Sequence, residues 1–167
     1  MTSTYEKIAT NTVTGSSVAD VTFSTISGSY TDIVLIAQIK IESTTSATVF
    51  QLNGDSGSNY SYTVLTGTGS AANSSRTTNQ TYGIVDFNGF PPTAANTFNA
   101  VIMSFNNYSN ATTNKTVLSR ANNAASGVDA LVSLWRNTSA VTSIKLFNTG
   151  ANISVGSTFT LYGIKAE

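Results

Sequence analysis

Histidine and cysteine are both absent from this chain of 167 residues, and only 10% of its residues are charged. Histidine is the side chain best suited to acid–base catalysis near neutral pH and the commonest metal ligand, and the cysteine thiolate is a strong nucleophile. The lack of histidine alone excludes a Ser–His–Asp triad. These absences favour a protein that binds or assembles, and we expect a non-enzyme with no cofactor and no metal.

Charge of either sign is scarce and balanced. Lys and Arg number 8, as do Asp and Glu, so the formal net charge is zero. Because the sequence shows no basic patch or tail, we expect no nucleic-acid partner. No apolar run approaches the ~20 residues that cross a bilayer, and the polar first residues lack the apolar core of a signal peptide. We therefore expect no membrane partner.

Neutral polar residues take the place of charge. Ser, Thr and Asn make up about four residues in ten, far above ordinary globular usage. Threonine is β-branched and suits an extended backbone, while its hydroxyl keeps an outer face wet. A surface of hydroxyls and amides should be insensitive to salt.

Strand-like runs recur along the chain, and no segment has a convincing helical period. The clearest run is Asp32–Ile41, in which every second residue from Ile33 to Ile41 is apolar. This alternation predicts a strand with one buried face. Because Val34 and Ile36 begin the other face, we expect a central strand whose first half is buried on both sides. The other predicted strands are Glu6–Thr12, Val18–Ser24, Thr48–Leu52, Tyr60–Leu65, Thr81–Phe87, Phe98–Phe105, Lys115–Arg120, Val128–Trp135, Thr142–Phe147 and Thr158–Lys165.

These runs predict an all-β fold, an antiparallel β-sandwich of about ten strands with little or no helix. Asn53-Gly54 and Asn88-Gly89 predict tight turns, and Pro91-Pro92 must lie outside any central strand. Gly67–Thr78 is the most loop-like stretch, and we expect an exposed loop there. No repeat or domain boundary is visible, so the chain is expected to form a single domain.

The densest polar motif runs from Asn53 to Tyr62 (NGDSGSNYSY). Asn53, Asp55 and Asn59 could offer oxygens to Ca²⁺ or to a sugar, but calcium loops usually bring several carboxylates, and Asp55 is the only one here. We therefore favour a hairpin turn held by side-chain bonds to the backbone. Tyr60 and Tyr62 share one face of the following strand, which would suit either a binding surface or the core.

A second polar stretch, Asn106–Lys115, links two good strands and includes Asn107, Tyr108 and Asn110. It is either a wet protein interface or a solvated connection, because its amides need partners if it is buried. The eight acids all fall at strand ends or turns, where we expect solvated or capping groups, although strands could still bring two of them together for glycosidase chemistry. Trp135 is expected in the core.

Several strings resemble small bacteriophage virion proteins, namely jelly-roll domains that serve as capsid decoration (cement) proteins or as tail-fibre heads. They are Asn53–Tyr62, Asn107–Arg120 (NYSNATTNKTVLSR), Trp135 with Thr142-Ser143-Ile144, and the terminal Gly156–Lys165 (GSTFTLYGIK). The resemblance implies a jelly-roll sandwich over residues 26–167, threefold assembly and a place on the outside of a virion. Residues 1–25 match nothing in it, and we expect an N-terminal arm and first strands that contact neighbouring subunits.

Three functions remain open on this basis. The first is a capsid decoration protein, a homotrimer on the outer surface of the shell whose partner is the major capsid protein. One domain fills the chain, which favours this role over a tail fibre with its long shaft. The second is a tail-associated head that binds a receptor or glycan, for which exposed aromatics in a groove would be diagnostic. The third is a jelly-roll hydrolase or lyase, which needs two acids, or an acid with Lys or Arg, in one cleft.

Overall fold

The computed structural model describes residues 4–43, 46–87, 97–123 and 125–165. These residues form strands joined by turns and contain no helix, so none is available to span a membrane. Asn88-Gly89 and Pro91-Pro92 lie outside the described residues. The strands are β1 (Tyr5–Thr12), β2 (Asp20–Phe23), β3 (Asp32–Ile39), β4 (Thr48–Leu52), β5 (Tyr60–Gly67), β6 (Ala72–Gln80), β7 (Gly83–Ile84), β8 (Asn99–Asn106), β9 (Lys115–Asn123), β10 (Gly127–Trp135), β11 (Ile144–Asn148) and β12 (Thr158–Ile164).

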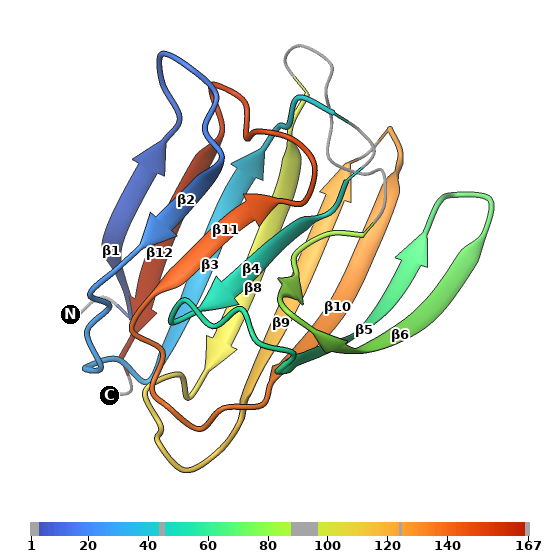
Figure 1. The fold of residues 1–167 in the computed structure, drawn as a ribbon. Coiled ribbons are helices and arrows are strands. Elements are labelled where there is room, and N and C mark those ends of the chain that lie inside the picture. Colours follow the sequence, from blue (N-terminus) through green and yellow to red (C-terminus); the bar gives the residue numbers. More distant parts are fainter. Residues whose placement is uncertain (1–3, 44–45, 88–96, 124, 166–167) are drawn as a thin grey trace.

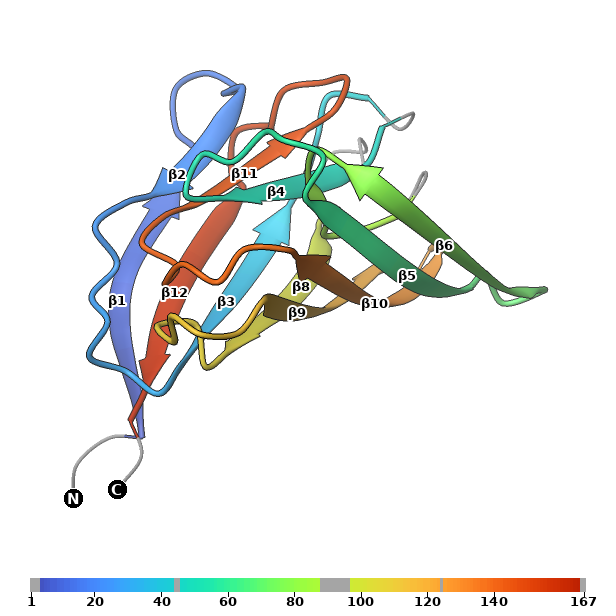
Figure 2. The same cartoon turned by 60° about the horizontal axis from the view of Figure 1, so that its bottom comes forward.

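The strands form two antiparallel sheets that lie face to face (Figures 1 and 2). The large sheet has eight strands in the order β1-β12-β3-β8-β9-β10-β5-β6, and the small sheet has four in the order β2-β11-β4-β7. The small sheet covers only part of the large one, and the β5–β6 hairpin extends beyond it (Figure 1). The expected all-β sandwich is confirmed.

The order of the strands is compatible with a jelly roll. Without the β5–β6 and β9–β10 hairpins, the sheets would read β1-β12-β3-β8 and β2-β11-β4-β7, and successive strands would alternate between them except at β4 and β7, which both lie in the small sheet. That alternation belongs to double-sheet jelly rolls built from Greek keys. The two hairpins both add strands to the same side of the large sheet, which makes it wider than its partner.

The core lies between the sheets and follows the alternation of the sequence. Ile33, Leu35 and Ile39 are fully buried, and Ala37 nearly so, and β3 lies inside the large sheet between β12 and β8. Trp135 is also buried, as expected. The other face of β3 differs from our expectation. Val34 is buried, but Ile36 is 42% exposed, because none of the described strands covers the outer side of the large sheet at this point.

Two further expectations change. The stretch from Gly67 to Thr78 is not simply a loop, because β6 occupies most of it and pairs with β5. In the N-terminal part, β1 pairs with β12 and β2 pairs with β11, so each is the edge strand of one sheet. The boundary at residue 25 therefore marks no break in the sandwich. Contact of this part with neighbouring subunits stays a prediction.

Candidate binding surfaces

The polar turn from Asn53 to Asn59 is held together by Asp55. Asn53 and Gly54 have positive φ angles of 53° and 70°, as the tight-turn prediction required. The Asp55 carboxylate accepts hydrogen bonds from the indole Nε1 of Trp135 (2.6 Å), the Gly57 amide (2.8 Å) and the Asn59 side chain (2.9 Å). Burial on its own would raise the pKa of Asp55, but these hydrogen bonds outweigh it and lower the pKa. The Asp55 carboxylate therefore serves to hold the turn in place.

Asn53 and Tyr60 connect this turn to the sandwich. The Asn53 side-chain oxygen accepts from the Thr142 and Ser143 amides at 2.8 and 3.1 Å. Tyr60 is fully buried and stacks on Trp135, with ring centroids 6.4 Å apart. Its hydroxyl accepts from the Leu52 amide and donates to the Asp55 carbonyl, and burial raises its pKa.

These positions correct the binding-surface interpretation of the two tyrosines. Tyr60 belongs to the main core, and Tyr62, 9% exposed, packs with Val64, Ile84 and Leu131 in a second apolar cluster. Neither ring offers a stacking platform to a ligand. Of the motif's candidates, Asn53, Asp55 and Asn59 are partly exposed and act as turn-forming groups.

The Asn106–Lys115 connection satisfies much of its polarity internally. Tyr108 is buried and its hydroxyl donates to the Ser27 carbonyl. Asn107 is exposed with a φ of 52°, and its amide donates to Asp32 at 2.6 Å. The Asn110 oxygen accepts from the amides of Thr112 and Thr113. Tyr108 is therefore no surface candidate, whereas Asn107 and Asn110 remain accessible.

Two acids differ from the expectation that every acid is a solvated or capping group. Asp86 and Asp129 are both fully buried. Asp86 accepts from the Thr48 amide (2.8 Å) and the Asn99 side chain (3.2 Å), and burial raises its pKa to about 7. Asp129 accepts from the Thr66 hydroxyl and the Phe87 amide (2.8 Å), and burial raises its pKa too. No cation among the described residues forms an ion pair with either acid.

Polar side chains of the large sheet hold the segment 84–87 across the sandwich. The Ser133 hydroxyl accepts from the Ile84 amide, the Ser119 hydroxyl donates to the Val85 carbonyl, and Asp129 accepts from the Phe87 amide. Our sequence analysis missed this role. The available signal was a polar residue on the inward face of an alternating strand, as at Ser119, Asp129 and Ser133.

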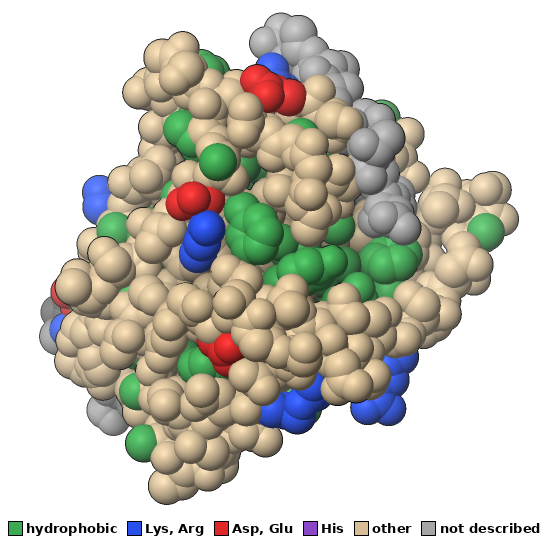
Figure 3. All heavy atoms as spheres, in the orientation of Figure 1, with side chains coloured by type: hydrophobic (Ala, Val, Ile, Leu, Met, Phe, Trp, Pro, Cys, Tyr) green, Lys and Arg blue, Asp and Glu red, His purple; other side chains and the backbone are tan. Residues whose placement is uncertain are grey.

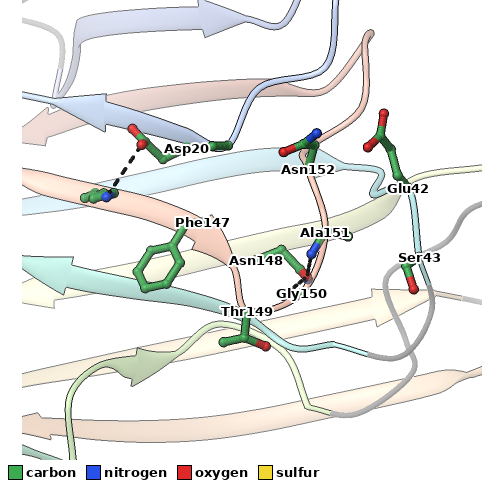
Figure 4. A pocket seen from close by; sticks show the side chains of 11 residues that line it. Asp20, Glu42, Ser43, Phe147, Asn148, Thr149, Gly150, Ala151 and Asn152 are labelled. Atoms are coloured by element: carbon green, nitrogen blue, oxygen red, sulfur yellow. Dashed lines mark hydrogen bonds and ion pairs between the residues drawn. The ribbon is translucent and has the colours of Figure 1, made fainter.

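A pocket of about 610 Å³ lies at one end of the small sheet (Figure 4). Asp20, Glu42, Lys145 and Phe147 line it, with the turn 148–152. The Lys145 ammonium lies 3.5 Å from Asp20 and 5.3 Å from the centroid of the Phe147 ring. The Asn148 side chain turns back onto the Gly150 and Ala151 amides.

This pocket combines an aromatic ring with hydrogen-bonding groups. Tyr82 meets Phe147 edge-on, with centroids 6.4 Å apart, and hydrophobic side chains gather over the middle of this side of the molecule (Figure 3). The pocket also brings two acids and a lysine together, which is the combination that the hydrolase or lyase alternative needs. Among the described residues, no three acids lie close enough to hold a metal ion.

The outer face of the large sheet carries an exposed apolar surface. Among the described residues, eight large hydrophobic side chains are exposed, and all but Tyr5 and Val155 point outward from the five neighbouring strands β3, β8, β9, β10 and β5. Ile36 lies directly opposite Ile102, and Leu118 directly opposite Val132. We call this surface the aliphatic face: Ile36, Leu65, Ile102, Leu118, Val128 and Val132.

Comparisons with known proteins do not assign a family. No family model matches the chain, and no curated protein matches it. Among solved structures, an alginate lyase has 12% sequence identity and a TM-score of 0.33, over 93% of this chain and 77% of the lyase. A mutant of that lyase in complex with alginate tetrasaccharide has 11% identity and a TM-score of 0.32, over 95% and 80% of the two chains. These similarities are too weak to indicate a shared family or activity.

Proposed function

We propose that the protein is a structural, non-enzymatic component of a bacteriophage particle, a capsid decoration protein that binds the outside of the assembled shell. The aliphatic face is the observation that carries the proposal, and the resemblance to virion jelly-roll proteins supplies the partner. A subunit that binds the assembled shell better than its separated parts stabilises the shell by mass action.

The aliphatic face has the character of a protein-binding surface. The uncovered side of an antiparallel sheet normally alternates to polar residues, yet here Leu118 is 50% exposed and Leu65 is 56% exposed. A contiguous apolar surface of this kind on a soluble domain marks an interaction site. Because few charges surround it, affinity would come mainly from burial of apolar area.

The proposal is tested by adding purified protein to capsids of the encoding phage that lack it. We expect the wild type to bind in a copy number that matches the shell lattice and to raise the temperature at which the capsids disrupt. Leu118→Asp should weaken binding at least about tenfold, because it places a charge in the apolar contact. Thr22→Asp, on the exposed outer side of β2, is the control that should bind normally.

Two results would contradict this function. The first is wild-type protein that does not bind to the capsids, and the second is a copy number that matches a tail component. Sedimentation of the free protein in the same experiment tests the homotrimer that we propose for the unbound state.

The Phe147 pocket supports a second candidate, a tail-associated head that binds a glycan. An apolar ring bordered by carboxylate and ammonium groups can stack on a sugar ring and bond its hydroxyls. A glycan array tests this role: Phe147→Ala should abolish binding, whereas Tyr5→Ala, which removes an exposed ring elsewhere, should not. No glycan bound by the wild type would end this candidate.

A further inference from the structure

We infer that the aliphatic face recognises an apolar surface of a different protein that presents an Asp or Glu carboxylate to Arg120. The inference rests on the proposed function, because it takes the aliphatic face to be the capsid-binding interface. It adds the chemistry of the partner: aliphatic or aromatic side chains around one acidic group. Nothing in the sequence analysis had singled out Arg120.

Arg120 lies within the aliphatic face. On the neighbouring strands, Ile102 of β8 and Ala130 of β10 lie directly opposite it. Leu118 precedes it by two residues on the same side of β9, and all four residues are exposed. Directly opposed side chains in a sheet approach within contact distance. Aliphatic side chains therefore surround Arg120 on the surface of the sheet.

The guanidinium group has no partner carboxylate within the described part of the chain. The ion pairs there join Lys145 to Asp20 and Lys165 to Glu6. Asp129, on the strand next to Arg120, points into the core. The acid on the outer face is Asp32, which lies four residues along β3 from Ile36 and accepts a hydrogen bond from the Asn107 amide.

Charge therefore argues against a second copy of this chain as the occupant. Two such faces would bring their Arg120 side chains together, and Asp32 is the acid that the described residues of this face offer to oppose them. Like charges that face each other across an interface strongly disfavour association. A partner that carries a carboxylate satisfies both the apolar surface and the cation.

Arginine is well suited to this position. Its guanidinium is more weakly hydrated than an ammonium and pairs with a carboxylate through two parallel hydrogen bonds. When a partner covers Ile102, Leu118 and Val132, water is excluded around the pair, which strengthens their attraction. Arginines inside an apolar ring are frequent centres of binding energy in protein interfaces.

The test compares charge reversals at Arg120 and Arg76, using the full chain and the same phage capsids. Arg120→Glu should weaken binding at least about 100-fold, because two carboxylates would then meet in a desolvated contact. Arg120→Lys keeps the charge but not the paired geometry and should weaken binding about tenfold. Arg76→Glu, which makes the same change in net charge outside the aliphatic face, should stay within about threefold of wild type.

The possible results separate the two proposals. If wild type binds and Arg120→Glu behaves like Arg76→Glu, the carboxylate partner is wrong while the decoration function stands. If wild type does not bind the capsids, both proposals fall. If wild type self-associates and Leu118→Asp abolishes the association, a second copy occupies the aliphatic face and the inference is overturned. Thermal unfolding of each variant shows whether it remains folded.

Discussion

Asp86 is a buried carboxyl group to which the described residues of the core supply hydrogen bonds but no cation. Its pKa is raised to about 7 by burial, against about 3.9 for an unfolded aspartate. The folded chain therefore binds more protons than the unfolded chain between these two values. The stability from this group is fully present below about pH 4 and is lost as the pH rises through about 7, by at most ~1.4 kcal/mol per pH unit.

We predict that urea unfolding between pH 5 and pH 8 will show this decline, and that Asp86→Asn will flatten it and raise stability at pH 8. The amide oxygen can still accept from the Thr48 backbone. Once the Asn99 amide turns over, the new NH₂ group can donate to the buried Asn99 oxygen, which has no hydrogen-bond partner among the described residues of the wild type. Glu42→Gln, at an exposed acid, is the matched control. The chain has no histidine, and Asp129 is the other acid whose pKa burial raises, so a flat wild-type profile would mean that neither acid ionises at a cost in the core.

Asp55 affects the pH dependence of stability in the opposite direction to Asp86. Its pKa is lowered in the folded chain by the three hydrogen bonds that it accepts, despite burial. Its contribution is therefore present above the unfolded pKa and is lost as the pH falls below about 4. We predict that Asp55→Ala will destabilise the protein by about 3 kcal/mol at neutral pH, since the buried Trp135 indole loses its acceptor. Ser56→Ala, at an exposed position in the same turn, should cost less than about 0.5 kcal/mol, and equal losses in the two variants would refute the role of Asp55.

At the scale of elements, the sequence predicted strands wherever one face is buried. The run at Thr158–Lys165 matches β12 closely, because burial of one face imposes a period of two on apolar residues. The run at Thr48–Leu52 matches β4, whose residues are buried on both faces. β6 has no buried face, so its side chains carry no such period and the stretch reads as a loop. The aliphatic face was harder to predict from the sequence. It depends on the small sheet packing against one side of the large sheet, and the sequence pattern of a single strand does not show which side is covered.

The same exposure makes β6 the strand that we expect to open most readily. Among the described strands it pairs with β5 alone, at the edge of the large sheet, and most of its residues are exposed. Local opening costs least where backbone hydrogen bonds are exposed and apolar contacts are few. In hydrogen–deuterium exchange, peptides from β6 should exchange at least about tenfold faster than peptides from β10, which lies between two strands. Similar protection of β6 and β10 would mean that the edge is covered, for example by a second subunit.

At the scale of the whole molecule, apolar burial and backbone pairing hold the sandwich, and surface charge contributes little. The ion pairs among the described residues are Lys145–Asp20 and Lys165–Glu6, whose side chains are 38–52% exposed. Exposed pairs of this kind contribute little to stability, because solvent screens them. Lys115 is buried, but its ammonium bonds the carbonyls of Thr113 and Thr138 and does not pair with an acid.

We therefore predict that the unfolding temperature at neutral pH changes by less than about 2 °C when NaCl is raised from about 0.05 M to about 0.5 M, because screening has few favourable pairs to weaken. Calorimetry measures this directly, and a fall of more than about 5 °C would show that ion pairs are important to the fold.

Capsid binding should behave differently, because the pairing of Arg120 with a partner carboxylate contributes long-range attraction that salt weakens before contact. Salt should thus slow wild-type association more than that of Arg120→Gln, while leaving the stability of both chains nearly unchanged.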